Sequence, residues 1–200
     1  MASTHRDPVC LDEAADTWAD LYSLLAECLK EPTTEFVEEA GSGLLASELD
    51  LYAERLDLQL ADTEPPEPEA CSRLTREYLA LFEGMETPFA PPVESPYEEW
   101  YEGAGRTGLL GGPAAADMEQ RYERLGVVPS MQYPADHLAL LLEYGALLLD
   151  AGATDEFDAF ATEHFDWVPA FRERVDDAAA DAPFYRWVVA VVDDVVSATP

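Results

Sequence analysis

Hydrophobic side chains recur along this chain with the three- and four-residue spacing of α-helices. The first such run forms one apolar face that Pro32 ends, and it consists of Leu11, Ala14, Ala15, Trp18, Leu21, Tyr22, Leu25 and Leu29. The same spacing predicts helices over residues 44–60, 70–82, 114–125, 154–165, 169–179 and 184–196. Residues 138–149 are apolar on nearly every side, which is typical of a helix at the centre of a bundle. No stretch alternates like a strand, so the predicted fold class is all-α.

Prolines and glycines mark the breaks between these helices. The sequence Thr-Glu-Pro-Pro-Glu-Pro-Glu at 63–69 indicates a linker or exposed loop, and residues 61–69 are a candidate hinge. Residues 85–113 are rich in proline and glycine and predict a long irregular loop, a feature that is usually functional or mobile in a compact domain. With 200 residues, we expect a single helical domain over residues 1–200.

The charge of the chain is strongly acidic. Forty-two Asp and Glu residues stand against 11 Lys and Arg, a formal net charge of -31, yet 48% of the residues are hydrophobic, so the chain should fold rather than stay disordered. The acids are spread along the whole chain, as expected of a halophilic surface. In dilute buffer their repulsion destabilises the compact state, whereas at molar salt the Debye length falls to roughly 3 Å.

Composition also argues against several classes of partner and cofactor. The arginines are scattered and Lys30 is the only lysine, so nucleic acid is not expected as a partner. Cys10, Cys28 and Cys71 are far apart and form no C-x-x-C pair, which indicates reduced thiols rather than a disulfide framework or a zinc site. No apolar run approaches the roughly 20 residues of a spanning helix. We therefore expect a cytoplasmic protein without stable membrane insertion and without a cofactor.

Catalytic motifs are weakly represented. Ser95 does not lie in a G-x-S-x-G turn, and no glycine-rich phosphate loop with a lysine occurs. A metal-dependent enzyme using Asp136, His137, Glu143 and His164 stays as the least favoured alternative, because no ligand spacing supports it. Asp136, in the first turn after a proline, has an equally good interpretation as a helix cap.

Three short motifs nevertheless occur in a recognisable order. They are Tyr78-x-x-Leu81-Phe82-x-Gly84, then Pro92-x-x-Ser95-x-Tyr97, then Asp136-His137, and they are followed by Phe160-x-x-x-His164-x-x-Trp167-x-x-x-Phe171 and Pro183-Phe-Tyr185. From about residue 18 to the end, the chain resembles the TorD/DmsD family of molybdoenzyme-specific chaperones, as a haloarchaeal-type member. It departs from the family pattern at Tyr133 and Leu141, where an acidic residue is common, and at Val93, where an aromatic residue is common.

The resemblance implies a helical chaperone that is not an enzyme. Such a protein binds the twin-arginine signal peptide and the apo form of a molybdopterin oxidoreductase, of the dimethyl sulfoxide, trimethylamine N-oxide or nitrate reductase type. It assists cofactor insertion and delays export until folding is complete. A homodimer is compatible with the resemblance, and the alternative is a non-catalytic helical adaptor for an unrelated partner.

The same resemblance suggests where the client would bind. We expect an apolar groove whose side chains hold the apolar part of the peptide, while carboxylates such as Asp136 or Glu94 pair with its arginines. The residues assigned to this site are Leu81, Phe82, Pro92, Val93, Glu94, Ser95, Tyr97, Asp136 and His137.

Overall fold

The computed structural model describes residues 11–66, 70–84, 88–97, 110–127, 132–178 and 181–199, and the named elements in this part of the chain are all helices. The helices are α1 (Leu11–Cys28), α2 (Thr34–Gly41), α3 (Leu44–Leu56), α4 (Cys71–Phe82), α5 (Pro113–Leu125), α6 (Leu138–Asp150), α7 (Thr154–His164), α8 (Val168–Asp177) and α9 (Pro183–Ala198), with a 3-10 turn η1 (Ser95–Tyr97). An isolated bridge between Val93 and His137 is the one β pairing in these residues. The predicted all-α class is confirmed.

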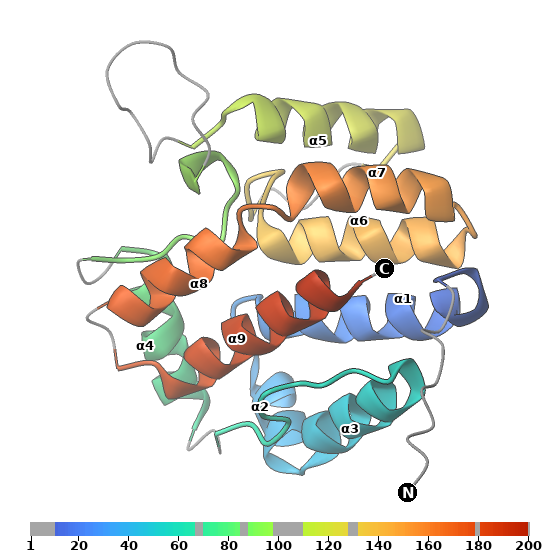
Figure 1. Ribbon diagram of the computed structural model, residues 1–200. Helices are drawn as coiled ribbons and strands as arrows, with labels where there is room; N and C mark the ends of the chain where they lie inside the picture. The colour runs from blue at the N-terminus through green and yellow to red at the C-terminus, as the bar shows by residue number, and fades with distance from the viewer. Residues whose placement is uncertain are drawn as a thin grey trace, which may run out of the picture.

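Helices α1 and α6 form the centre of the bundle. They share the most extensive interhelical contact in the described chain, with α7 against α6, α3 and α9 against α1, and α8 against α9 (Figure 1). Gly145 of α6 allows this close packing: a Cβ atom there would lie 3.2 Å from the Phe157 ring and 3.3 Å from the Tyr22 ring. The apolar run at 138–149 thus occupies the central position that its sequence predicts, although Leu147 on its outer side is exposed.

The predicted helices correspond to α1 and to α3 through α9, and one helix is missing from the prediction. Helix α2 has only eight residues, and the Thr33 side chain caps it by accepting a hydrogen bond from the Phe36 amide. Helix α3 is shorter than predicted, because Asp57 adopts a left-handed backbone conformation, with φ of 55°, and ends it.

The predicted loop at 85–113 is irregular where it is described, and its 88–97 segment is firmly attached to the bundle. The Ala90 amide donates to the Leu81 carbonyl at 2.7 Å, and the Leu138 amide donates to the Pro92 carbonyl at 2.8 Å. Residues 85–87 and 98–109 of this loop lie outside the described residues. The segment therefore joins the end of α4 to the start of α6.

The candidate hinge at 61–69 is described up to residue 66, and it contacts α9. The Ala61 amide donates to Asp194 Oδ2 at 3.0 Å, and the Trp187 indole donates to the Asp62 carbonyl at 3.0 Å. A hinge and a single domain over the whole chain both stay predictions.

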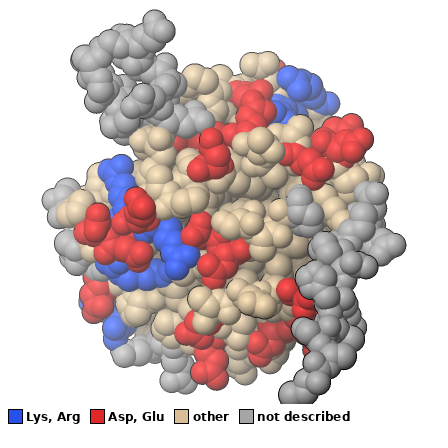
Figure 2. Space-filling view, viewed as in Figure 1, with Lys and Arg blue, Asp and Glu red and all other residues tan. Residues whose placement is uncertain are grey.

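Charge is mixed on the surface that Figure 2 shows. Acidic side chains are distributed over the visible face, and the basic side chains lie among them. Lys30, Arg121 and Arg172 each form ion pairs with carboxylates. In the described ranges, moreover, no helix has the length and apolar character needed to cross a membrane.

Candidate functional site

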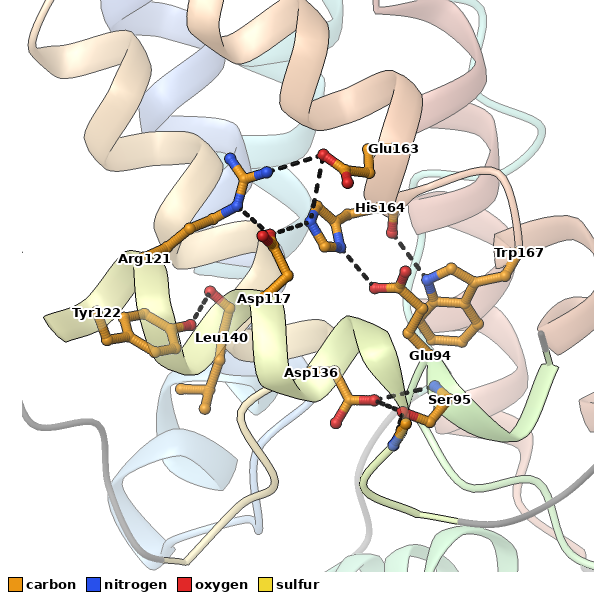
Figure 3. Close-up of polar contacts among 11 residues, drawn as sticks. Glu94, Ser95, Asp117, Arg121, Tyr122, Asp136, Leu140, Glu163, His164 and Trp167 are labelled. Atoms are coloured by element: carbon orange, nitrogen blue, oxygen red, sulfur yellow. Dashed lines mark hydrogen bonds and ion pairs between the residues drawn. The ribbon is translucent and has the colours of Figure 1, made fainter. Parts of the chain in front are cut away.

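Two of the sequence motifs meet at the beginning of α6. Oδ2 of Asp136 accepts hydrogen bonds from the Ser95 amide, at 2.9 Å, and from the Ser95 hydroxyl (Figure 3). The Ser95 hydroxyl oxygen in turn accepts from the Gly112 amide at 3.0 Å, immediately before α5. Asp136 is fully buried. It therefore fixes the loop that carries Ser95, rather than capping the helix.

His137 is the residue that caps α6. Its Nδ1 atom accepts from the Ala139 amide at 3.2 Å, and the Tyr133 ring lies tilted against its imidazole with centroids 4.5 Å apart. Burial lowers the pKa of His137 to about 3, and the positive charge of Lys30 contributes to the shift. The imidazole is therefore neutral, as a ring nitrogen that accepts a hydrogen bond requires.

A second polar cluster attaches the same loop to α7 and α5. His164 Nδ1 lies 2.8 Å from Glu94 Oε2 and its Nε2 lies 3.2 Å from Asp117 Oδ2, while Arg121 bonds to Asp117 and to Glu163 at 2.8 Å (Figure 3). Burial alone would lower the pKa of His164, but the bonds to Glu94 and Asp117 outweigh it and raise this pKa above its ordinary value.

The same cluster contains the one group of potential metal ligands found among the described residues. Ligand atoms of Asp117, Glu163 and His164 lie within 4.8 Å of one another. The guanidinium of Arg121 already forms ion pairs with both carboxylates, and Glu94 contacts the other nitrogen of His164. The cluster is thus complete as a structural network that connects three segments of the chain.

The predicted apolar groove is not formed by the residues assigned to it. Leu81, Phe82 and Val93 are at most 3% exposed, and the Phe82 ring packs edge-on against Tyr185 with centroids 5.1 Å apart. Tyr97 is half-buried, stacks on Trp167 at 5.1 Å and donates its hydroxyl to the Pro91 carbonyl. In this conformation these side chains build the core beneath the loop.

The two carboxylates expected to meet the client's arginines are also internal. Glu94 is 1% exposed and bonded to His164, and Asp136 is 0% exposed and bonded to Ser95. Pro92 is buried as well, next to the first residue of α6. These residues are internal because the loop uses their polar atoms for its own hydrogen bonds, whereas the sequence interpretation assigned the same atoms to a partner.

A pocket of about 740 Å³ lies elsewhere, between the end of α1, the start of α2, the end of α5 and the outer side of α6. Leu125, Val127 and Leu147 line it and are 52%, 47% and 52% exposed. Tyr122 and Tyr144 contribute aromatic rings to its wall. Because these exposed apolar side chains gather around one pocket, they form a candidate surface for a partner.

Charged groups surround this apolar surface. Lys30 Nζ lies 2.5 Å from Glu27 Oε1 and 2.6 Å from Glu143 Oε1. Burial alone would lower the pKa of Lys30, but its two carboxylate partners outweigh this and raise it. Glu31 donates its amide to the Tyr133 hydroxyl at 2.9 Å, so Tyr133 joins the pocket to the His137 ring.

Comparison with known proteins identifies the family. The family model of the nitrate reductase delta subunit matches residues 42–178, more than half of the chain. The chain belongs to the nitrate reductase delta subunit family. This is a family of maturation chaperones for molybdoenzymes, not a catalytic family, and the TorD-like resemblance is thereby confirmed. No curated protein matches the sequence.

Among solved structures, this chain is similar to a candidate redox enzyme maturation protein from Archaeoglobus fulgidus. The two chains superimpose with a TM-score of 0.54 over 98% of this chain and 99% of that one, at 17% sequence identity. At this identity the likeness concerns the fold, which it confirms as TorD-like.

The sequence interpretation relied on the family motifs and missed the residues of the pocket. Leu125 is the last residue of an ordinary amphipathic helix, Val127 follows that helix, and Leu147 lies in a run of leucines that is mostly buried. The one available signal was Lys30, an isolated lysine at a helix end in a chain with 42 acids.

Proposed function

We propose that this protein is a cytoplasmic chaperone that binds the twin-arginine signal peptide and the apo form of a molybdopterin oxidoreductase. It assists cofactor insertion and delays export until the client has folded. The observation that carries the proposal is the pocket with exposed Leu125, Val127 and Leu147 and a rim of glutamates, in a chain of a molybdoenzyme-maturation family.

The chemistry of the pocket suits a signal peptide in two respects. Its apolar surface matches the apolar segment of such a peptide, and covering a largely exposed leucine side chain contributes about 1 kcal/mol. Its rim carboxylates, Glu27, Glu31 and Glu143, match the peptide's two arginines. At molar salt the apolar part dominates, because salt screens exposed charges and strengthens apolar burial.

The motif residues then support the pocket instead of lining it. Asp136 and His164 hold the loop against α5, α6 and α7, and α5 and α6 supply the pocket's leucines. Tyr133, packed on the His137 ring, is the member of this region that reaches the pocket.

Binding of labelled signal peptides to the purified protein in molar KCl tests the proposal. Peptides of the dimethyl sulfoxide, trimethylamine N-oxide and nitrate reductase types would be compared, each with its twin arginines intact. The pocket variant is Leu125→Ser with Leu147→Ser, and we expect at least a tenfold loss of affinity.

A matched control is available on α3. Leu44 and Leu51 are 48% and 42% exposed and lie outside the pocket, so Leu44→Ser with Leu51→Ser makes the same chemical change on a similar exposed area. The control should bind as the unmodified protein does. Equal losses in both variants, or no saturable binding of any peptide by the folded protein, would contradict the proposal.

A further inference from the structure

The pocket contains a positive charge where the client's arginine would have to bind. Lys30, the only lysine of the chain, lies two residues after the end of α1 and bonds to Glu27 of α1 and Glu143 of α6. We propose that Lys30 is an internal occupant of a guanidinium site, and that an arginine of the client displaces it from these two carboxylates. The inference rests on the proposed function. It adds that Lys30 occupies the two carboxylates until a peptide with an arginine displaces it, so that weakly charged peptides do not gain this contact.

The two carboxylates around Lys30 can also accept a guanidinium in place of the ammonium that is now present. Glu27 and Glu143 come from two different helices, yet both reach a single atom, Lys30 Nζ, at 2.5 and 2.6 Å. A guanidinium has five donors in a planar arrangement and can bond to two carboxylates at once, whereas an ammonium is a compact, strongly hydrated charge. An arginine of the client can therefore bond to both carboxylates at once and compete with Lys30 for them.

The site is also open to a partner. The side chains of Glu27 and Glu143 are 61% and 40% exposed, while Lys30 is 26% exposed. Glu31 lies beside them on the pocket and is exposed. When Lys30 swings away, the rim carries three carboxylates, and the apolar surface of Leu147 lies one helical turn from Glu143 on α6.

The alternative role for Lys30 is a clamp between α1 and α6. These helices already share the most extensive contact of the described chain, including the packing around Gly145. Ion pairs between exposed groups contribute little to stability, so removal of Lys30 should leave the fold intact. The two roles therefore predict opposite outcomes in binding.

Three variants separate them. Lys30→Met keeps the length and apolar stem of the side chain but removes the charge, and Lys30→Arg keeps the charge and fills the site. We expect Lys30→Met to bind the twin-arginine peptide about three- to tenfold more tightly than the unmodified protein. Lys30→Arg should bind no more tightly, and Glu143→Gln added to Lys30→Met should remove the gain.

The peptide provides a second control, in which both arginines are replaced by glutamine. Its affinity should be the same for the unmodified protein and for Lys30→Met. A gain of equal size with this peptide, or affinity for the arginine peptide that is unchanged or lower in Lys30→Met, would overturn the inference and leave the proposed function standing. Absence of binding by every variant would contradict the proposed function itself.

A direct measurement follows displacement without any substitution. Protein grown with ¹³C-lysine gives one side-chain Cε resonance, because Lys30 is the sole lysine. This resonance should shift and sharpen when the arginine peptide saturates the protein, and should stay in place with the glutamine peptide. An unshifted resonance at saturation with the arginine peptide would show that Lys30 keeps its carboxylates.

Discussion

Substituting Asp136 tests how the loop of the Ser95 motif is held. Asp136→Ala removes the acceptor of two hydrogen bonds, from the amide and from the hydroxyl of Ser95, at a fully buried position. Hydrogen bonds to a charged group contribute about 1.5–3 kcal/mol each, and a buried donor left without a partner costs about 1–3 kcal/mol. The cost of burying the carboxylate offsets part of the stability that these hydrogen bonds contribute, since its Oδ1 has no hydrogen-bond partner among the described residues.

The net loss expected for Asp136→Ala is therefore about 3 kcal/mol of unfolding free energy. Asp136→Asn keeps an oxygen that can accept from Ser95 but replaces the second carboxylate oxygen by an amide NH2, so its cost should be smaller, about 1 kcal/mol. The loss for Asp136→Ala is a large share of the 5–15 kcal/mol that stabilises a typical domain.

Urea unfolding at a fixed molar KCl concentration, followed by circular dichroism, measures these losses. With a urea dependence of about 2 kcal/mol/M, Asp136→Ala should lower the midpoint by about 1.5 M. Ser95→Ala is the matched partner variant, and the double variant should cost less than the sum of the two single ones. A free energy for Asp136→Ala within about 0.5 kcal/mol of the unmodified protein would refute the role given to this carboxylate.

Three further predictions concern pH, capping and salt. The pKa of His164 is raised in the folded protein, so the stability that its protonation contributes is complete below about pH 6.5 and is lost as the pH rises through the folded-state pKa. In His164→Gln the melting temperature should therefore fall less steeply with pH above 6.5 than in the unmodified protein. The same dependence of melting temperature on pH in both proteins would contradict this. Thr33→Ala should cost about 1 kcal/mol in urea unfolding, because the Phe36 amide loses its acceptor, and an unchanged midpoint would exclude that cap. Lowering KCl from molar to 0.1 M should lower the melting temperature, since the Debye length grows to about 10 Å, and an unchanged value would argue against a halophilic surface.

The fold was largely predictable because its helices are amphipathic or wholly apolar over several turns. The leucine run of α6 identified the centre of the bundle, and Pro32 identified the end of α1. Helix α2 was missed because eight residues give barely two turns, too few for a period to be counted. Its cap at Thr33 was the local signal that could have revealed it.

The candidate site was predictable only in part. The sequence singled out Ser95, Asp136 and His137 as client-binding residues, and the structure places Ser95 against Asp136, with His137 as the cap of α6. It did not show that they are buried. A polar side chain that binds a partner and one that anchors a loop can occupy the same position in a sequence motif, so the motif does not distinguish the two roles. Nor does periodicity distinguish the exposed Leu147 from its buried neighbours, since exposure depends on which helices pack on α6.

The contact between Ser95 and Asp136 also has a consequence for the topology of the chain. It joins two residues 41 positions apart and so closes a loop that contains α5 and, with it, Leu125 and Val127 of the pocket wall. Closing a loop of this length costs about 3 kcal/mol of chain entropy. The contact between the buried motif residues offsets part of this cost, so these residues help to hold one wall of the pocket in place, although none of their side chains lines it.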